Sequence, residues 1–233
     1  MVRHIDRLGA THYQLDVHTK NPFRWAQVRG RLKAILSQEN TDLVHVRSRV
    51  PAWIALPAAA ALGIATVSTV HGRFIALSAL KRIYNRKLLK TDHVIAISNH
   101  VKDLITRQYV DVEKRLTVVH RGVDIDLFNP NNVNQTRIVN FVEGMAIPED
   151  VPVIMLPARA TKWKGHQILL QALAKIKDRP FICLMVGAGD GKPAFVSELV
   201  RYGLKLGLEG RFRLTPLVDD MPAALMVADV VAM

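Results

Sequence analysis

The chain of 233 residues contains one cysteine, few aromatic side chains and fewer acidic than basic residues. A single cysteine, Cys183, excludes an internal disulfide framework, which fits a reducing compartment. Because Cys183 lies in the apolar run FICLMV, we expect a buried thiol with a packing role. Aromatic residues make up 6% of the chain and none interleaves a basic run, so stacking platforms for nucleic-acid bases are not evident. We therefore expect no nucleic-acid partner.

The sequence also has no visible signal peptide and only one long run without charge. Its start, MVRHIDRLGATH, lacks the apolar core of a signal peptide. The uncharged run covers residues 51–70, which is long enough to cross a bilayer. Its prolines, glycine and alanines make it less apolar than most spanning helices. A helix over Ala52–Ala61, a stop at Gly63 and a strand over Ala65–Val70 explain the same residues, and we favour this interpretation.

Positive charge is concentrated in the first half of the chain. The formal net charge is +12, and hydrophobic residues make up 49%, which is typical of a globular protein. Residues 1–128 hold 20 Lys and Arg against 10 Asp and Glu, whereas residues 129–233 hold 12 against 10. A basic surface suits nucleic acid, anionic lipid or a phosphorylated substrate, and net charge alone does not choose among them.

The hydrophobic pattern alternates between short strands and helices in two series. This alternation predicts an α/β protein with two doubly wound, Rossmann-like lobes, over residues 1–128 and 129–233, each expected to be partial. The expected strands of the first series are Tyr13–Val17, Leu43–Val46, Ala65–Val70, Val94–Ile97 and Leu116–His120, and its expected helices are Trp25–Ser37, Ala52–Ala61, Ile75–Leu89 and Val101–Gln108. The expected strands of the second series are Val153–Leu156, Phe181–Val186, Arg211–Leu214 and Val230–Ala232.

The segment from Val153 to Leu173 carries the clearest chemical signal. A short apolar strand leads into a loop with Arg159, Lys162 and Lys164, and an amphipathic helix follows. A helix N-terminus presents unpaired N–H groups and partial positive charge, and Arg and Lys add full charges. The pattern predicts an anion site, with phosphate as the natural ligand.

Six segments in order give the chain a resemblance to a known family. It resembles the retaining glycosyltransferases of family 4, and within them the bacterial members that build lipopolysaccharide or other surface glycans. The segments are TVHG (69–72), VIAISNHVKDLI (94–105), VVHRGVDIDLFNP (118–130), LPARATKWKGHQILLQAL (156–173), LMVGAGD (184–190) and VDDMPAALMVADVV (218–231). Within the third segment, Arg121 stands where the family often has Asn.

The resemblance implies a GT-B architecture, with an acceptor lobe followed by a lobe that binds a nucleotide-diphosphate sugar. It implies that Arg159 and Lys164 grip the donor diphosphate and that His71, with Gly72 beside it, faces the donor from the first lobe. It further implies donor contacts at four positions of the second lobe, and transfer with retention to a glycan or lipid-linked acceptor. These positions are Gly187, Gly189, Val218 and Met221. The family's acidic motif of two Glu is not found before Met233.

No cofactor or metal is expected. Enzymes of this architecture generally work without a divalent ion, and no His/Cys/Asp cluster here has convincing ligand spacing. Gly187 and Gly189 do not complete the GxGxxG fingerprint, which argues against the alternative of a nicotinamide-dependent enzyme. Two further alternatives are a catalytically incomplete nucleotide-binding fragment and a basic nucleic-acid-binding module.

The segment from Arg73 to Lys90 combines apolar residues at helical spacing with a basic flank. This pattern suits a helix that contacts an anionic membrane, or equally a core-facing stripe with a solvated basic face. We expect a cytoplasmic protein, with the inner face of the cytoplasmic membrane as a candidate surface. At helix starts, we interpret Ser98, Asp219 and Asp220 as capping or first-turn residues, and His166 as structural or exposed.

Overall fold

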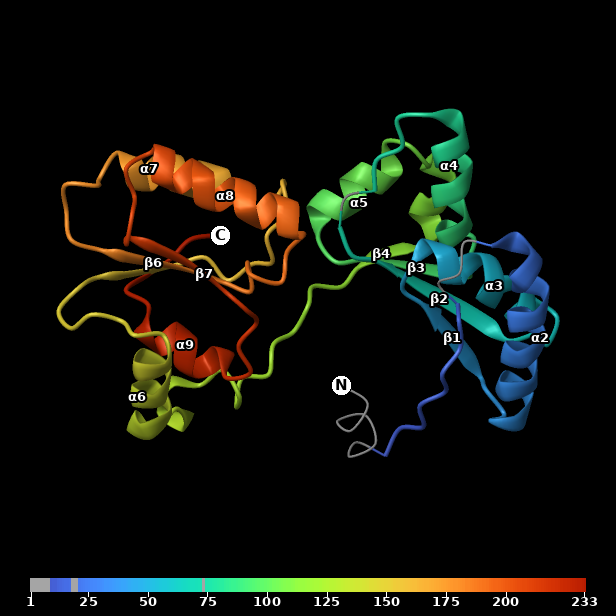
Figure 1. Cartoon of the computed structure of the whole chain (residues 1–233). Helices are drawn as coiled ribbons and strands as arrows, with labels where there is room; N and C mark the ends of the chain where they lie inside the picture. Colours follow the sequence, from blue (N-terminus) through green and yellow to red (C-terminus); the bar gives the residue numbers. More distant parts are fainter. Residues whose placement is uncertain (1–8, 18–20, 73) are drawn as a thin grey trace. The chain divides into compact units, whose positions relative to one another are not determined.

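The computed structural model describes residues 9–17, 21–72 and 74–233, and these residues form two compact units, Met1–Gly122 and Val123–Met233 (Figure 1). Each unit is built on its own parallel β-sheet flanked by helices. The sequence-based boundary at 128/129 lies a few residues beyond the division between the units.

The first unit is built on a four-stranded parallel sheet with the order β1-β2-β3-β4. Its strands are β1 (Leu43–Val46), β2 (Ala65–Val70), β3 (His93–Ala96) and β4 (Leu116–Val118). Its helices are α2 (Pro22–Gln38), α3 (Arg49–Ala60), α4 (Ala79–Arg86) and α5 (Asn99–Thr106), with 3₁₀ turns at Lys87–Leu89 and Val110–Arg115. Strands and helices alternate as the hydrophobic pattern predicts. Because neighbouring strands are parallel, each crossover brings the chain back to the end of the sheet at which the strands begin.

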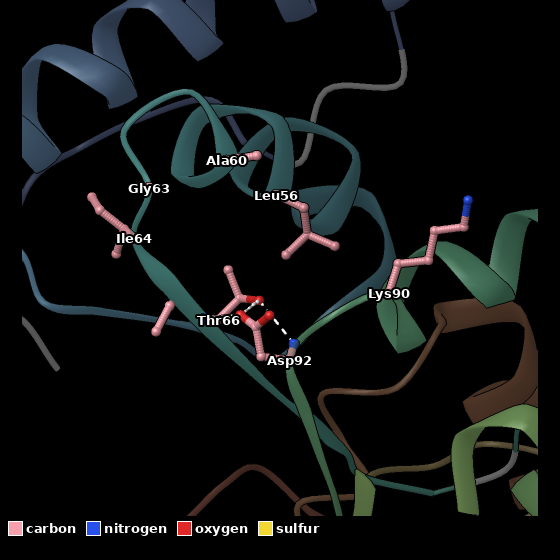
Figure 2. A pocket seen from close by; sticks show the side chains of 8 residues that line it. Leu56, Ala60, Gly63, Ile64, Thr66, Lys90 and Asp92 are labelled. Atoms are coloured by element: carbon pink, nitrogen blue, oxygen red, sulfur yellow. Dashed lines mark hydrogen bonds between the residues drawn. The ribbon is translucent and has the colours of Figure 1, made fainter. Parts of the chain in front are cut away.

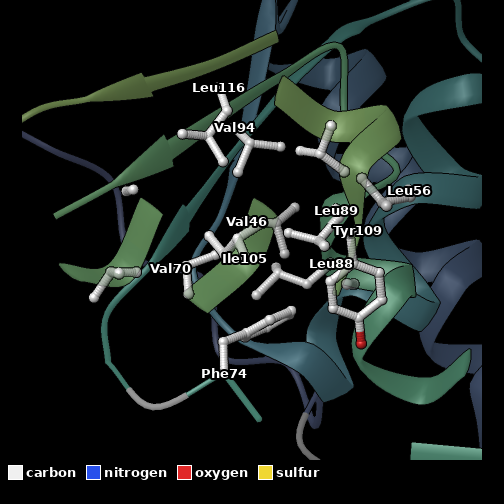
Figure 3. Packing of buried hydrophobic residues seen from close by; sticks show 14 of the residues in the cluster. Val46, Leu56, Val70, Phe74, Leu88, Leu89, Val94, Ile105, Tyr109 and Leu116 are labelled. Carbon is white, nitrogen blue, oxygen red and sulfur yellow. The ribbon is translucent and has the colours of Figure 1, made fainter. Parts of the chain in front are cut away.

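One face of this sheet packs against the helices and forms the core. Figure 3 shows Val70 and Val94 of the strands together with Leu56, Ile105 and Tyr109. The aromatic ring of Trp53 stacks between Trp25 of α2 and Tyr84 of α4, with centroid distances of 5.9 and 6.4 Å, which joins the three helices. Strand residues on the opposite face, among them Leu43 and His45, are exposed.

The uncharged run folds as a helix, a turn and a strand, as predicted. Helix α3 ends at Ala60, Gly63 takes a φ of 68°, and β2 begins at Ala65. Only glycine adopts this left-handed conformation without steric cost. In the part of the chain that the structure describes, no helix is long and apolar enough to cross a membrane.

Two predicted elements of the first unit are corrected. Residues 13–17 form no strand, because a strand needs a paired neighbour and β1 pairs with β2 alone among the described residues. The helix predicted from Arg73 or Ile75 begins only at Ala79, since Ser78 caps it by accepting a hydrogen bond from the Lys81 amide. Arg73 itself lies outside the described residues.

The second unit has a parallel sheet with the order β7-β6-β5-β8. Its strands are β5 (Val153–Met155), β6 (Ile182–Val186), β7 (Phe212–Thr215) and β8 (Val230–Val231). Its helices are α6 (Gln135–Gly144), α7 (His166–Ala174), α8 (Pro193–Lys205) and α9 (Met221–Val227), and a 3₁₀ turn lies at Pro130–Asn132. Helices α7 and α8 cover one face of this sheet and α6 and α9 the other (Figure 1). Two covered faces explain why β6 is buried along its whole length.

Several local expectations are confirmed in the two units. Cys183 on β6 is fully buried, and burial raises the pKa of its thiol to about 12, so it is an inert packing residue. Ser98 caps α5 by accepting a hydrogen bond from the Val101 amide. Asp220 caps α9 through the Ala223 amide and also forms a two-pronged ion pair with Arg137 of α6, which fastens the two helices together.

Two helical glycines, one in each unit, give a matched test of packing. A Cβ atom on Gly203 of α8 would lie 2.3 Å from the ring of Phe212, whereas one on Gly30 of α2 would meet nothing within 4 Å. We expect Gly203→Ala to lower the free energy of unfolding by about 1–3 kcal/mol through overpacking. We expect Gly30→Ala to raise it by about 0.5–1 kcal/mol. Urea titrations measure both, and a stabilised Gly203→Ala protein would contradict this packing.

Candidate functional site

The candidate site residues follow the carboxyl ends of the strands in both units. In the first unit, Arg47 follows β1, His71 follows β2 and Arg121 follows β4. In the second unit, the loop with Arg159 follows β5, and Gly187 follows β6. In a parallel sheet all carboxyl ends lie at one edge, which is where open α/β sheets bind their ligands.

His71 lies between two arginine side chains of its own unit. The Arg47 Nε–H donates a hydrogen bond to Nε2 of His71 at 3.1 Å, and Nη2 of Arg121 lies 2.6 Å from Nδ1. The pKa of His71 is lowered, mainly by desolvation and then by the charges of Arg47, Arg121 and His45. His45 is itself engaged with Thr69, whose hydroxyl is 2.7 Å from the His45 Nε2. Sequence reasoning singled out His71 but missed Arg47, and it left the contact of Arg121 open.

Gly72 has no steric need to be glycine within this chain. Its φ is not in the left-handed region, and a Cβ atom there would meet nothing within 4 Å. The space that glycine leaves beside His71 is therefore open toward a ligand, and its role in donor binding stays a prediction.

The loop after β5 holds the basic residues of the second unit at the surface. The Ala158 amide donates to the Val186 carbonyl of β6 at 2.9 Å, which anchors the start of the loop to the sheet. Arg159 and Lys164 are exposed beyond this anchor. Nζ of Lys164 lies 4.4 Å from the centre of the Trp163 ring, a cation–π contact that restrains the Lys164 side chain. No role for Trp163 was expected from the sequence.

Helix α7 starts at the end of this loop without a side-chain cap. Gly165 is its N-cap residue, with a φ of 79°, and no side chain accepts a hydrogen bond from the first turn. The amide groups of this turn, together with the helix dipole, favour an anion at this position. The predicted combination of a helix N-terminus with Arg159 and Lys164 is therefore present in one loop.

His166, the first residue of α7, links the end of the loop back to its start. Its side chain is 1% exposed, and Nε2 lies 3.0 Å from the carbonyl oxygen of Ala158, so Nε2 donates. Nδ1 is buried and has no partner in the described chain. Burial lowers the pKa of His166, the Ala158 contact raises it, and the charge of Lys164 lowers it, with burial dominant. The structural interpretation of His166 is confirmed, and its contact closes the loop that carries Arg159 and Lys164.

The glycines after β6 lie close to neighbouring backbone. Gly187 has a φ of 80°, and a Cβ atom there would approach the Leu217 side chain to 3.3 Å. A Cβ atom on Gly189 would lie 3.1 Å from the backbone at Thr215. The carboxylate of Asp190 accepts a hydrogen bond from the Leu217 amide at 2.6 Å and ties this turn to the segment after β7. Glycine is thus required here for the close approach of two loops at the sheet edge.

Met221 is the first residue of α9, Val218 lies in the loop before it, and both are partly buried. Both pack against the cluster that contains Ile182, Leu184 and Ala224. Their positions are set by this packing, while each keeps part of its surface accessible. Their predicted contact with the donor base stays a prediction.

A cavity in the first unit lies at the opposite edge of the sheet from His71. It measures about 430 Å³ and is lined by residues at the beginning of β2 and β3, as Figure 2 shows for Thr66, Lys90 and Asp92. The Asp92 carboxylate accepts hydrogen bonds from both the amide and the hydroxyl of Thr66, each at 2.7 Å, and these contacts lower its pKa. Since its carboxylate is already paired, the cavity carries no unpaired acid and does not belong to the candidate site.

No grouping of three or more metal-ligating side chains occurs within residues 9–17, 21–72 and 74–233. The expectation of a metal-independent site stays a prediction.

Comparison with known proteins identifies the family. The profile of Glycosyltransferase Family 4 matches residues 5–127, and that of Glycosyl transferases group 1 matches residues 151–233. The chain belongs to glycosyltransferase family 4. A crystal structure of a glycosyltransferase from Rickettsia africae superimposes on 99% of this family 4 chain, with a TM-score of 0.83 and 32% sequence identity. The predicted fold, with two α/β lobes of GT-B type, is thereby confirmed.

Two other similar proteins extend the comparison. The HepE protein of Anabaena, solved in complex with UDP-glucose, has a TM-score of 0.79 at 19% identity over 99% of this chain and 62% of its own. A D-inositol 3-phosphate glycosyltransferase of Xylanimonas cellulosilytica is 30% identical over 145 residues, which are 61% of this chain and 34% of that enzyme. The family 4 chain therefore spans about a third of this curated relative, and it spans 61% of the Rickettsia structure.

The buried His166 predicts a pH dependence of stability. Because its pKa in the fold lies below the ordinary value of 6.5, the unfolded chain binds more protons as the pH falls through 6.5, and the folded state loses stability. We expect His166→Gln, whose amide can still donate to Ala158, to cost about 1 kcal/mol at neutral pH. It should lose less stability than the wild type between about pH 7.5 and about pH 5.

Urea unfolding at several pH values measures this slope. The pKa of His71 is also lowered, but His71 is present in both the wild type and His166→Gln. The difference in pH dependence between the two proteins therefore measures the contribution of His166. His120→Gln removes an exposed histidine and serves as the control. An unchanged slope in His166→Gln would contradict the assignment.

Proposed function

We propose that the full-length protein transfers a sugar from a nucleotide-diphosphate donor to a glycan or lipid-linked acceptor, with retention of configuration. The observation that carries the proposal is the loop with Arg159 and Lys164 at the uncapped start of α7. The motif resemblance supports a role in lipopolysaccharide or surface-polysaccharide synthesis. Because the chain spans part of its relatives, donor binding is the activity that we assign to this chain itself.

The proposed role of Arg159 and Lys164 is to stabilise the leaving group. As the sugar–phosphate bond breaks, negative charge grows on the nucleoside diphosphate, and cations already in position stabilise it more than they stabilise the ground state. At an effective dielectric constant of about 20, one pair of unit charges about 4 Å apart gives about 4 kcal/mol, or roughly three decades in rate. Two such residues beside helix α7 can replace a divalent ion, so we propose a metal-independent reaction without a cofactor.

Other residues at the two sheet edges receive supporting roles. We assign His71, beside the open position of Gly72, to the donor sugar. Gly187 and Gly189 let backbone approach the nucleotide, and Val218 and Met221 offer apolar surface to its base. The alternative is that the chain binds the nucleotide without catalysing transfer.

Binding of nucleoside diphosphates tests the donor site. Tryptophan fluorescence titrations with UDP, GDP and ADP identify the tightest of the three. We expect Arg159→Gln and Lys164→Gln each to weaken that binding about tenfold or more, because each removes a charged contact to phosphate. Lys162→Gln, an exposed change in the same loop, should alter affinity less than about twofold. Equal losses for Lys162→Gln, or no binding of any of the three, would contradict the proposal.

We further propose that the protein contacts the inner, anionic face of the cytoplasmic membrane through the segment around α4. Leu80 and Ile83 lie three residues apart on α4 and are 81% and 62% exposed, and Leu77, which precedes the helix, is 90% exposed. We call these three side chains the apolar stripe. Residues 77–90 contain five basic and no acidic side chains. A hollow of about 330 Å³ beside the stripe is lined by Arg49, Ile75, Leu77 and Lys81, which mixes charge with apolar surface. This arrangement supports contact with lipid headgroups through Lys81 and with acyl chains through the stripe.

Sedimentation with liposomes of phosphatidylcholine, with and without phosphatidylglycerol, tests this contact. The wild type should prefer anionic liposomes, and the double variant Leu80→Ser/Ile83→Ser should bind them about tenfold more weakly. The control Leu204→Ser/Met226→Ser changes two hydrophobic residues of similar size that are 48% and 42% exposed in the second unit. Loss of binding in the control, or no preference for anionic lipid, would contradict the membrane contact.

A further inference from the structure

The cluster of Arg47, His71 and Arg121 contains more hydrogen-bond donors than acceptors. Arg47 donates to Nε2 of His71 at 3.1 Å, and Nη2 of Arg121 lies 2.6 Å from Nδ1. A guanidinium group is always charged and only donates, whereas a neutral imidazole has one acceptor nitrogen and one N–H. One arginine can therefore bond to the ring, and the other meets an N–H group.

Protonation of His71 does not relieve this conflict. The imidazolium ion has two N–H groups and no acceptor, and it would add a third positive charge between the arginines. Desolvation lowers the pKa of His71 most, and the charges of Arg47, Arg121 and His45 lower it further. The cluster needs an acceptor that the ring cannot supply in either protonation state.

The surrounding chain supplies no carboxylate. Among the described residues, neither Arg47 nor Arg121 forms an ion pair with an acid, in contrast to Arg86 and Arg137, which pair with Asp111 and Asp220. Both arginines are exposed, and His71 is partly buried between them. The three residues follow β1, β2 and β4, so the sheet holds them at one edge. Uncompensated cations that a rigid sheet brings together are the usual construction of an anion site.

We propose that Arg47, His71 and Arg121 bind a phosphate group carried by the acceptor substrate. A phosphate has enough acceptor oxygens for both guanidinium groups and for an N–H of the ring, and arginine matches its planar, two-pronged geometry. The inference rests on the proposed function, in which the second unit binds the donor through its own cations, Arg159 and Lys164. It also gives a role to Arg121, which stands where the family often has Asn.

Histidine-selective ¹⁵N NMR of the full chain tests the site directly. Inorganic phosphate and glycerol 3-phosphate are titrated while the ring resonances of His71, assigned with His71→Gln, report protonation. We expect saturable shifts and a rise in the pKa of His71 on binding, because a bound dianion stabilises the imidazolium form. Arg47→Gln and Arg121→Gln should each weaken phosphate binding about fivefold or more. Arg29→Gln, an equal loss of charge on exposed α2, should change it less than about twofold.

A second experiment tests whether the phosphate bound at this cluster belongs to the acceptor or to the donor. Arg47→Gln and Arg121→Gln should leave the affinity for UDP, GDP and ADP within about twofold, and these nucleotides should not displace glycerol 3-phosphate from His71. Displacement, or loss of nucleotide affinity in these variants, would overturn the proposal in favour of the donor, and an absent His71 response would overturn it outright. Failure of nucleotide binding with an intact His71 response would refute the donor site alone.

Discussion

Parallel strand pairing governs the chemistry of both units. Because every strand of a parallel sheet points the same way, residues that follow different strands meet at one edge. In the first unit this pairing brings Arg47 and Arg121 to opposite sides of the His71 ring. In the second it brings the turn after β6 against the segment after β7, where Asp190 accepts a hydrogen bond from the Leu217 amide. The sites are therefore products of strand order and register.

A site made of cations needs support from groups that are not charged. In the second unit, the central strand β6 is buried on both faces and provides a rigid base, to which the amide of Ala158 is bonded. The imidazole of His166 then ties the start of α7 back to Ala158, so the loop between them has two fixed ends. Because its two ends are fixed, the loop loses less conformational entropy when a ligand binds, which favours a preformed phosphate site.

The hydrophobic pattern predicted the regular elements well and the irregular ones poorly. Strands β1 and β2 begin and end at the predicted residues, and the uncharged run divides at Gly63 as expected. The predicted strand at Tyr13–Val17 is absent, because alternation alone does not provide a neighbouring strand. The helix expected from Ile75 starts at Ala79, since the capping of the Lys81 amide by Ser78 outweighs the apolar spacing that precedes it.

By itself the sequence determined the alternation of strands and helices, the burial of Cys183, the basic character of the first half and the ordered motifs of family 4. Arg159, Lys164 and the start of α7 were also predictable, because they are neighbours along the chain. Only the tertiary structure decided that Arg47 and Arg121 meet His71, across 24 and 50 residues of sequence. These contacts join residues whose spacing in the sequence carries no periodic signal, and their proximity depends on which strands pair and in which register.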